Sequence, residues 1–378
     1  MLKFVLFSLL AVFSLGKTPE KVSVKITEQL LSTDPMSYAP EGFRGRETPY
    51  GNNNHVQYSV VSLWVHALQC AELRGDADLE KRLLDLYEPF ASGIRRSLPP
   101  EHVDYSIYGA LPLEVYLHNG DPRALKIGLS YADAEWEEPL EGKVSEAHGN
   151  FPWAKQHELW DEGLSAQARL WIDDLYMITL LQVQAFRATG DKKYLDRAVR
   201  TMKYYLPRVM QENGLCYHAP DVPYVWGRGM GWVAAGLTLL LENMEEKNSD
   251  RDLFLQYYRT MTSTLLSCQR KNGFWGQLVL DPESWDESSC TAMFAWSLAV
   301  GINHGWLDTK TCRRAVKKAW KALVGKVDVN GNLGGICDGT DRRNSREWYM
   351  GRGQSTGDPH GQAPLMWLAQ ELIKIEKK

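Results

Sequence analysis

The chain has 378 residues, of which 44% are hydrophobic and 24% are charged. This composition is typical of a globular protein long enough to bury a sizeable core, and it excludes a disordered chain. The formal net charge of −4 argues against a nucleic-acid partner. Beyond the first residues, no apolar run approaches the roughly 18 residues that span a bilayer, so we expect no stable membrane insertion.

The first 16 residues have the pattern of a secretory signal. Lys3 precedes an apolar run over 4–13, and Ser14 and Gly16 are small residues at the −3 and −1 positions of a cleavage site. We therefore expect a protein exported to the periplasm or to the extracellular space. No linker interrupts residues 17–378, which we predict to form a single domain.

The six cysteines are scattered and form no C-x-x-C pair, so they indicate neither a zinc site nor a redox motif. One or two disulfides and isolated buried thiols are both compatible with an exported protein. No pattern in the sequence indicates a metal site or a cofactor, and none indicates the oligomeric state.

Helical periodicity covers most of the chain, and strand-like alternation is scarce. Glycine followed by aspartate at 75–76, 120–121 and 190–191 predicts tight turns, because glycine fits the left-handed C′ position and aspartate caps the next helix. Helices are predicted over residues 56–73, 78–87, 107–117, 123–134, 174–187, 194–205, 230–246, 251–269, 289–304, 311–324 and 362–375.

Helical hairpins at these intervals fit an open solenoid or a closed all-α (α/α)6 barrel of six hairpins. We favour the barrel, because closure would bring the aromatic, acidic and histidine residues of one set of loops to a single mouth.

The chain also has 14 Trp and 17 Tyr, many beside Gly, Asn, Asp or His. Indole rings in such loops stack on sugars, although a single Trp is as often a core residue.

Acidic residues mark the first two candidate site segments. Residues 168–177 place Asp173 and Asp174 inside an otherwise apolar helix, where an ionised carboxylate is costly unless it is paired or has a functional role. Both share a helix face with apolar residues, so periodicity does not decide which one points inward. Asp104 lies just before a predicted helix, where a first-turn acid is the alternative explanation.

A third segment is rich in glycine and tryptophan. His218 comes shortly before a run in which three glycines alternate with Trp226, Arg228, a methionine and Trp232. The glycines allow a ligand to approach the backbone closely, and an arginine suits a carboxylate. The alternative is a glycine-rich turn with core tryptophans. A phosphate site is not indicated, because the run lacks G-x-G-x-x-G and a P-loop lysine.

The fourth segment lies near the end of the chain. Tyr349 and Arg352 are followed by Asp358 and His360, directly before the last predicted helix. A histidine at a helix start is often an ordinary capping or surface residue. Here the neighbouring tyrosine, arginine and aspartate make a role in ligand binding equally compatible with the pattern.

Together these motifs resemble the unsaturated glucuronyl and rhamnogalacturonyl hydrolases of glycoside hydrolase families 88 and 105, with the closer likeness to family 105. The resemblance rests on W-x-D-x-L-Y-M at 171–177, on a histidine before W-x-R-G-x-G-W at 226–232, and on D-x-H-G at 358–361. It extends from about His102 to the C-terminus. It implies an (α/α)6 barrel that acts on oligosaccharides, removing a 4,5-unsaturated uronic acid from the non-reducing end left by a polysaccharide lyase.

In these families a carboxylic acid protonates the C4–C5 vinyl ether, water adds at C5, and the resulting hemiketal opens and releases the rest of the oligosaccharide. The resemblance implies that Asp173 is the catalytic acid and base, and that Asp104 is a second acidic residue near the sugar ring. It further implies that a set of residues contacts the substrate: His218, Trp226, Arg228, Trp232 and His360. From their neighbourhood we add Tyr349 and Arg352 to this set.

Two other functions are compatible with the residues themselves. One is another carbohydrate enzyme on the same barrel, such as an epimerase or an inverting hydrolase. The other is a non-catalytic protein that binds glycans through its aromatic side chains and has no need of buried acids.

Overall fold

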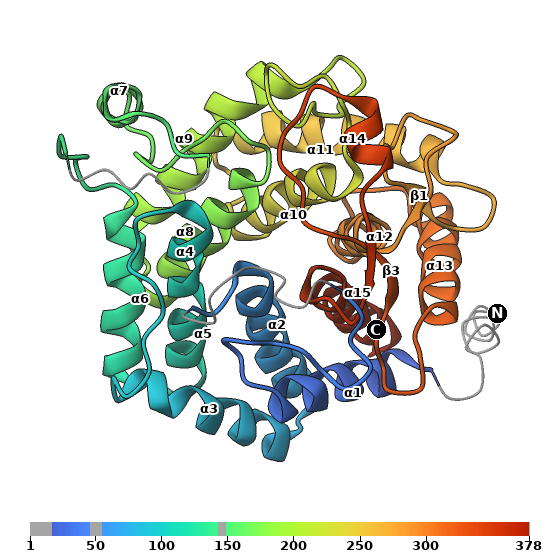
Figure 1. Cartoon of the computed structure of the whole chain (residues 1–378), viewed down its shortest axis with the longest axis horizontal. Coiled ribbons are helices and arrows are strands. Elements are labelled where there is room, and N and C mark those ends of the chain that lie inside the picture. Colours follow the sequence, from blue (N-terminus) through green and yellow to red (C-terminus); the bar gives the residue numbers. More distant parts are fainter. Residues whose placement is uncertain (1–16, 46–54, 143–148, 378) are drawn as a thin grey trace.

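Two concentric rings of helices make up the molecule (Figure 1). The computed structural model describes residues 17–45, 55–142 and 149–377, so the expected signal over 1–16 lies outside the described residues. The inner ring consists of α2 (Tyr58–Arg74), α5 (Ala110–Asn119), α8 (Asp174–Thr189), α10 (Gly227–Asn243), α12 (Ser288–Asn303) and α15 (Pro359–Lys377). The outer ring consists of α1 (Pro19–Ser32), α3 (Ala77–Ala91), α6 (Pro122–Ala134), α9 (Lys192–Val209), α11 (Arg251–Cys268) and α13 (Thr309–Gly325).

Each inner helix packs against the next one along the chain, and α15 packs against α2, which closes the ring. Outer helices pack against the inner helix of the same hairpin, as in α5 with α6 and α8 with α9. The fold is therefore the closed (α/α)6 barrel, as predicted, and not an open solenoid.

The predicted Gly-Asp turns are confirmed. Gly75, Gly120 and Gly190 all adopt the left-handed conformation, with φ of 68°, 70° and 71°. The aspartate after each glycine accepts a hydrogen bond from a backbone N–H in the first turn of the next helix. These turns stabilise the hairpins because they satisfy backbone groups at both helix ends.

Helix α1 was not predicted from the sequence, although its signals are present. Thr18 caps the helix through its side chain, and Pro19 occupies the first turn. Val22, Ile26 and Leu30 recur every fourth residue and are buried. The helix supplies the twelfth long element, and it packs against α15 and α2 where the ring closes.

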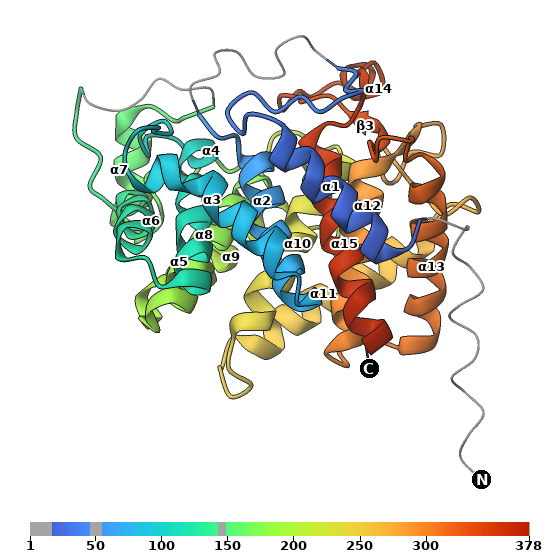
Figure 2. The ribbon, with the colours of Figure 1, turned by 90° about the horizontal axis from the view of Figure 1, so that it is seen from below.

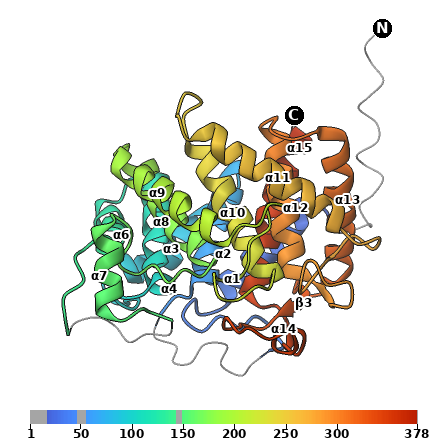
Figure 3. The same ribbon diagram turned by 90° about the horizontal axis from the view of Figure 1, so that it is seen from above.

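Short elements gather at one end of the barrel. They are α4 (Val103–Ser106), the 3-10 helix η1 (Ile107–Gly109), α7 (Trp153–Asp161), α14 (Arg346–Met350) and two antiparallel pairs, β1 (Trp275–Gly276) with β2 (Asp286–Glu287) and β3 (Gly334–Cys337) with β4 (Gln354–Thr356). Figures 2 and 3 show α4, α7, β3 and α14 at this end.

An aromatic layer fills the inside of the inner ring. Tyr176 of α8 stacks on Trp232 of α10 and on Trp367 of α15, with ring centroids 4.8 and 5.3 Å apart. All three are fully buried. Aromatic side chains of this size bury large apolar areas, so the layer is a major part of the core.

All six cysteines lie among the described residues and are free thiols, five of them buried. Of the two sequence-based alternatives, the structure therefore contains isolated thiols.

Within the described ranges, no helix is long and apolar enough to cross a membrane.

Glu135, directly after α6, is a fully buried carboxyl whose Oε2 accepts a hydrogen bond from Gln182 at 2.9 Å. Burial raises its pKa from 4.5 to about 8. The folded protein therefore holds this proton more tightly than the unfolded chain does. Its contribution to stability is fully present below about pH 4.5 and is lost as the pH rises to about 8.

We expect the free energy of unfolding of the wild type to fall between pH 5 and pH 8 by an amount on the order of several kcal/mol from this group. Glu135→Gln keeps the shape but does not ionise, so its unfolding free energy should fall much less over that window. Urea denaturation at a series of pH values measures the difference. Parallel pH profiles for the two proteins would contradict the assignment.

Candidate active site

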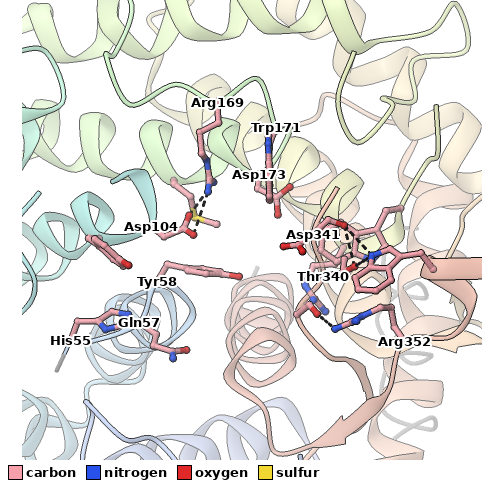
Figure 4. Close-up of a pocket in the computed structure, with 16 residues that line it drawn as sticks. His55, Gln57, Tyr58, Asp104, Arg169, Trp171, Asp173, Thr340, Asp341 and Arg352 are labelled. Atoms are coloured by element: carbon pink, nitrogen blue, oxygen red, sulfur yellow. Dashed lines mark hydrogen bonds and ion pairs between the residues drawn. The ribbon is translucent and has the colours of Figure 1, made fainter. Parts of the chain in front are cut away.

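A cavity of about 340 Å³ opens where inner helices α2, α8 and α10 begin. Since the N-terminal ends of these helices border one cavity, they run in the same direction. Among the residues expected to form the site, a group of five lines the cavity: Asp104, Asp173, Trp226, Arg228 and Arg352. Figure 4 shows Asp104 and Asp173 on one side and Arg352 on another.

Asp173 occupies the residue before α8 and turns its carboxylate towards the cavity. Its side chain is 12% exposed, and its Oδ2 lies 3.3 Å from Nε2 of His218. The imidazole of His218 lies between Trp171 and Trp226, with ring centroids 5.9 and 4.8 Å away. The carboxylate thus has an imidazole on one side and open space on the other.

His218 does not line the cavity and instead lies behind Asp173. Its Nδ1 is 2.5 Å from the hydroxyl of Tyr349, which also accepts a hydrogen bond from the Arg343 amide at 3.4 Å. Tyr349 thus holds the imidazole at Nδ1, and Nε2 is the ring nitrogen that faces Asp173. Burial raises the pKa of Tyr349, which keeps it a neutral donor.

Asp174 is the adjacent acid, and the structure turns it away from the cavity. It is fully buried, and its two oxygens accept hydrogen bonds from the backbone amide and the guanidinium of Arg169 and from Tyr205 at 2.7 to 2.9 Å. This geometry answers the question that periodicity left open: Asp173 faces the cavity, and Asp174 has a structural role.

Arg169 connects the two parts of the site. While one side of its guanidinium binds Asp174, Nη2 lies 3.1 Å from Oδ1 of Asp104, and the plane packs over Trp171 at 4.8 Å. The pairing favours the ionised form of Asp104. Asp104 borders the cavity as a carboxylate, with its side chain 29% exposed.

The turn that carries these groups is strained. Leu170 has φ of 59°, and among the described residues it is the only one other than glycine with a positive φ. A β-carbon in this conformation costs about 1–2 kcal/mol. The backbone N–H of Leu170 donates to Tyr205, which in turn donates to Asp174. The buried Asp174 therefore holds the turn that directs Arg169 and Trp171 to the cavity.

Arg228 borders the cavity and also anchors the chain beyond β3. Its guanidinium donates to the carbonyls of Cys337 at 2.5 Å and Asp338 at 3.2 Å, and it packs over Trp226 at 4.7 Å. Arg352 similarly donates to the carbonyl of Gly339. The two arginines thus fix a loop that contributes to the cavity wall, in addition to placing positive charge there.

The remaining predicted residues lie outside the cavity lining. Trp232 belongs to the buried aromatic layer, because it points from α10 into the core. Tyr349 contacts His218, as described above. His360 is fully buried behind Tyr58, a residue that does line the cavity. The residues predicted from the sequence therefore include direct neighbours of the cavity and others that lie one side chain further out.

A family model described as Glycosyl Hydrolase Family 88 matches residues 39–376. The chain belongs to glycosyl hydrolase family 88. Among curated proteins, it is similar to the unsaturated 3S-rhamnoglycuronyl hydrolase of Formosa agariphila, with 30% identity over 250 residues, which is 58% of this chain and 65% of that protein. An enzyme of the same name from Alteromonas sp. is 27% identical over 43% of this chain and 42% of the other. The chain thus aligns with less than two thirds of the length of either relative.

Solved structures share the fold. A possible member of the GH105 family from Salmonella enterica superposes with a TM-score of 0.75 at 19% identity, covering 94% of each chain. The unsaturated glucuronyl hydrolase of Bacillus sp. GL1 superposes with a TM-score of 0.65 at 16% identity, covering 94% of this chain and 96% of that one. The sequence-based resemblance to these families is confirmed, as is the barrel.

Several residues of this family 88 site were not predicted from sequence. Arg169 and Trp171 lie within the same segment as Asp173. A buried acid in this segment needs a basic partner, and that requirement could have identified Arg169. Tyr58 and the polar loop at 339–341 gave no comparable signal, because only the closed ring brings them to the cavity. Over the described residues, no group of three or more His, Cys, Asp or Glu side chains is arranged to hold a metal ion.

Proposed function

We propose that this protein is a hydrolase that removes a 4,5-unsaturated uronic acid from the non-reducing end of lyase-generated oligosaccharides. Membership of family 88 and the names of the curated relatives support the proposal. The observation that carries it is a single cavity in which the carboxylate of Asp173 faces open space beside two arginines, Arg228 and Arg352. A uronate supplies the matching carboxylate, and the cavity has the volume of a small-molecule site.

In this proposal Asp173 donates a proton to C4 of the vinyl ether, and the bond between C4 and C5 becomes a single bond as positive charge develops at C5. The Nε2–H of His218 then stabilises the new carboxylate through Oδ2, which lies 3.3 Å away. A water molecule adds at C5 and returns a proton to Asp173. The hemiketal opens as the C5–O5 bond breaks and C5 becomes a ketone, which leaves C1 as a hemiacetal that carries a hydroxyl group and the glycosidic oxygen. The hemiacetal collapses to an aldehyde, and the rest of the oligosaccharide leaves as an alcohol that keeps the glycosidic oxygen and takes up the hydroxyl proton.

Asp104 is assigned a different role from Asp173. Because Arg169 binds its carboxylate, Asp104 stays ionised and accepts hydrogen bonds from sugar hydroxyls. Two carboxyl groups in different surroundings thus take different roles, a recurrent arrangement in glycosidase sites.

The test is a panel of pectin-, ulvan- and gum-derived unsaturated oligosaccharides, followed by the ultraviolet absorbance of the conjugated uronate. We expect absorbance to fall with at least one substrate. No loss across the panel would contradict the hydrolase assignment and favour a glycan-binding protein or another carbohydrate enzyme.

Arg228→Ala is expected to raise KM by about 10- to 100-fold, because a charged hydrogen-bond partner of the uronate is lost and the loop at 338–341 is released. The kinetics on the best substrate of the panel measure the effect. Arg208→Ala is the matched control, since Arg208 packs on Tyr204 at an exposed position away from the cavity. An unchanged KM in Arg228→Ala would contradict the proposed role.

We also propose that the protein is exported, on the strength of the signal-like segment at 1–16. Fractionation of cells that express the full chain tests this. Retention of the uncleaved chain in the cytoplasm would contradict it.

A further inference from the structure

Three side chains form a row that ends at the cavity. Oδ1 of Asp358 accepts hydrogen bonds from the backbone N–H and from Nδ1 of His360, at 2.9 and 2.6 Å. On the other side of the ring, Nε2 of His360 lies 2.5 Å from the hydroxyl of Tyr58. Asp358 and His360 are buried, whereas Tyr58 lines the cavity with Asp104 and Asp173.

Ring closure creates this row. Tyr58 is the first residue of α2, and His360 lies in the first turn of α15, 302 positions later in the sequence. The two helices are neighbours because the last hairpin packs on the first. Tyr58 is the member that reaches the cavity, where Figure 4 shows it pointing into the space next to Asp104 and Asp173.

The contacts in the row follow an order. Although burial acts to raise the pKa of Asp358, its interactions with His360 outweigh burial and hold the pKa below the usual value. Asp358 is therefore an ionised acceptor, and Nδ1 of His360 donates to it. The ring held in this way presents Nε2 to the Tyr58 hydroxyl, 2.5 Å away, and so fixes the direction in which that hydroxyl faces the cavity.

A carboxylate, an imidazole and a hydroxyl in this order also occur in sites where the hydroxyl is a nucleophile. That role does not suit Tyr58. Burial and the nearby Asp104 raise its pKa far above 10, so the phenol does not ionise near neutral pH. The row orients the hydroxyl and does not activate it.

We propose that Asp358 and His360 are positioning residues that fix the Tyr58 hydroxyl as a hydrogen-bond partner for a hydroxyl group of the bound uronic acid. The inference rests on the proposed function, because that hydroxyl group belongs to the substrate. It moves His360 from the substrate-contacting set to a position one side chain behind it, and it adds Tyr58 as a residue that contacts the sugar.

The simpler role for Asp358 is that of an N-cap of α15, which needs only the hydrogen bond from the backbone N–H of His360. The contact between His360 and Tyr58 contributes nothing to a cap. Variants of His360 therefore separate the two roles. The amide of an asparagine at 360 lies where Nδ1 was and keeps the Asp358 contact, whereas the longer glutamine reaches the place of Nε2 and keeps a hydrogen-bond partner for Tyr58.

The experiment measures KM and kcat on an unsaturated oligosaccharide for four variants: Tyr58→Phe, His360→Asn, His360→Gln and the double variant Tyr58→Phe/His360→Asn. We expect Tyr58→Phe and His360→Asn each to raise KM about tenfold. The double variant should be no worse than Tyr58→Phe alone, because both changes remove the same hydrogen bond. His360→Gln should recover most of the wild-type KM.

The matched control is His66→Asn, since His66 is also buried and also contacts a neighbour, Gln370, through Nδ1, but lies in the middle of α2 and does not line the cavity. It should leave KM unchanged. Thermal melts report whether each variant is folded. If His360→Asn does not fold, Tyr58→Phe still tests the contact of the hydroxyl with the substrate, and His360→Gln, which should keep the wild-type KM, tests the support behind it.

An unchanged KM in Tyr58→Phe overturns the inference, as do effects that multiply in the double variant or a His360→Gln that is as impaired as His360→Asn. These results leave the proposed function standing, since the wild type turns over substrate in the same assay. Absence of wild-type turnover contradicts the proposed function, and with it this inference.

Discussion

Replacing Asp173 with asparagine is expected to lower kcat by about 10²- to 10⁴-fold, the usual contribution of a general acid and base. KM should change little, because the amide has the same shape and the arginines of the cavity remain. The reason lies in the geometry: Asp173 faces the cavity with one oxygen and His218 with the other. Initial rates and a binding titration of the folded variant measure the two quantities.

The matched control is Asp308→Asn, which alters an exposed N-cap of α13 by the same chemical change. It should keep the wild-type kcat. If Asp173→Asn also turns over substrate at the wild-type rate, Asp173 is not the acid, and Asp104 becomes the next residue to test.

Arg169→Leu should lower the free energy of unfolding by about 3–5 kcal/mol, since it leaves the buried Asp174 without its cationic partner. It also removes the partner of Asp104 and relaxes the turn at Leu170. Urea denaturation of wild type and variant at neutral pH measures the loss. Adding Asp174→Leu to Arg169→Leu should recover part of it, because a buried apolar pair replaces an unpaired charge.

Arg123→Leu provides the comparison. Arg123 pairs with Glu88 and Asp121 on the surface, with half of its side chain exposed, and such pairs contribute about 0–1 kcal/mol. A loss in Arg169→Leu no larger than that in Arg123→Leu would contradict the structural role given to the buried network.

Local patterns were sufficient to predict the helices of the barrel. Helical periodicity and the Gly-Asp turns act over a few residues, so a sequence displays them directly, and the predicted helices correspond to eleven of the twelve long ones in the described residues. Closure was favoured because it would bring the aromatic, acidic and histidine residues of one set of loops to a single mouth. The structure brings Asp104, Asp173 and Trp226 to one cavity.

Contacts between residues far apart in the sequence could not be predicted from it. The hydroxyl of Tyr349 orients His218 from 131 positions away, and Tyr58 meets His360 across 302. Neither pair has a local spacing that could reveal it. The position of Trp232 could not be predicted from local sequence either. The glycines before it suggested a bound ligand, but they allow α10 to pack closely against its neighbours, as at Gly231 against Met293.

The most direct test of the central claim compares wild-type rates on an unsaturated disaccharide and on its saturated counterpart, in which the uronic acid lacks the C4–C5 double bond. Protonation of a vinyl ether by Asp173 requires that bond. We predict release of the second sugar from the unsaturated disaccharide only, together with loss of its ultraviolet absorbance, and a release at least about 10²-fold slower in Asp173→Asn. Equal hydrolysis of both disaccharides, or hydrolysis of neither, would contradict the account.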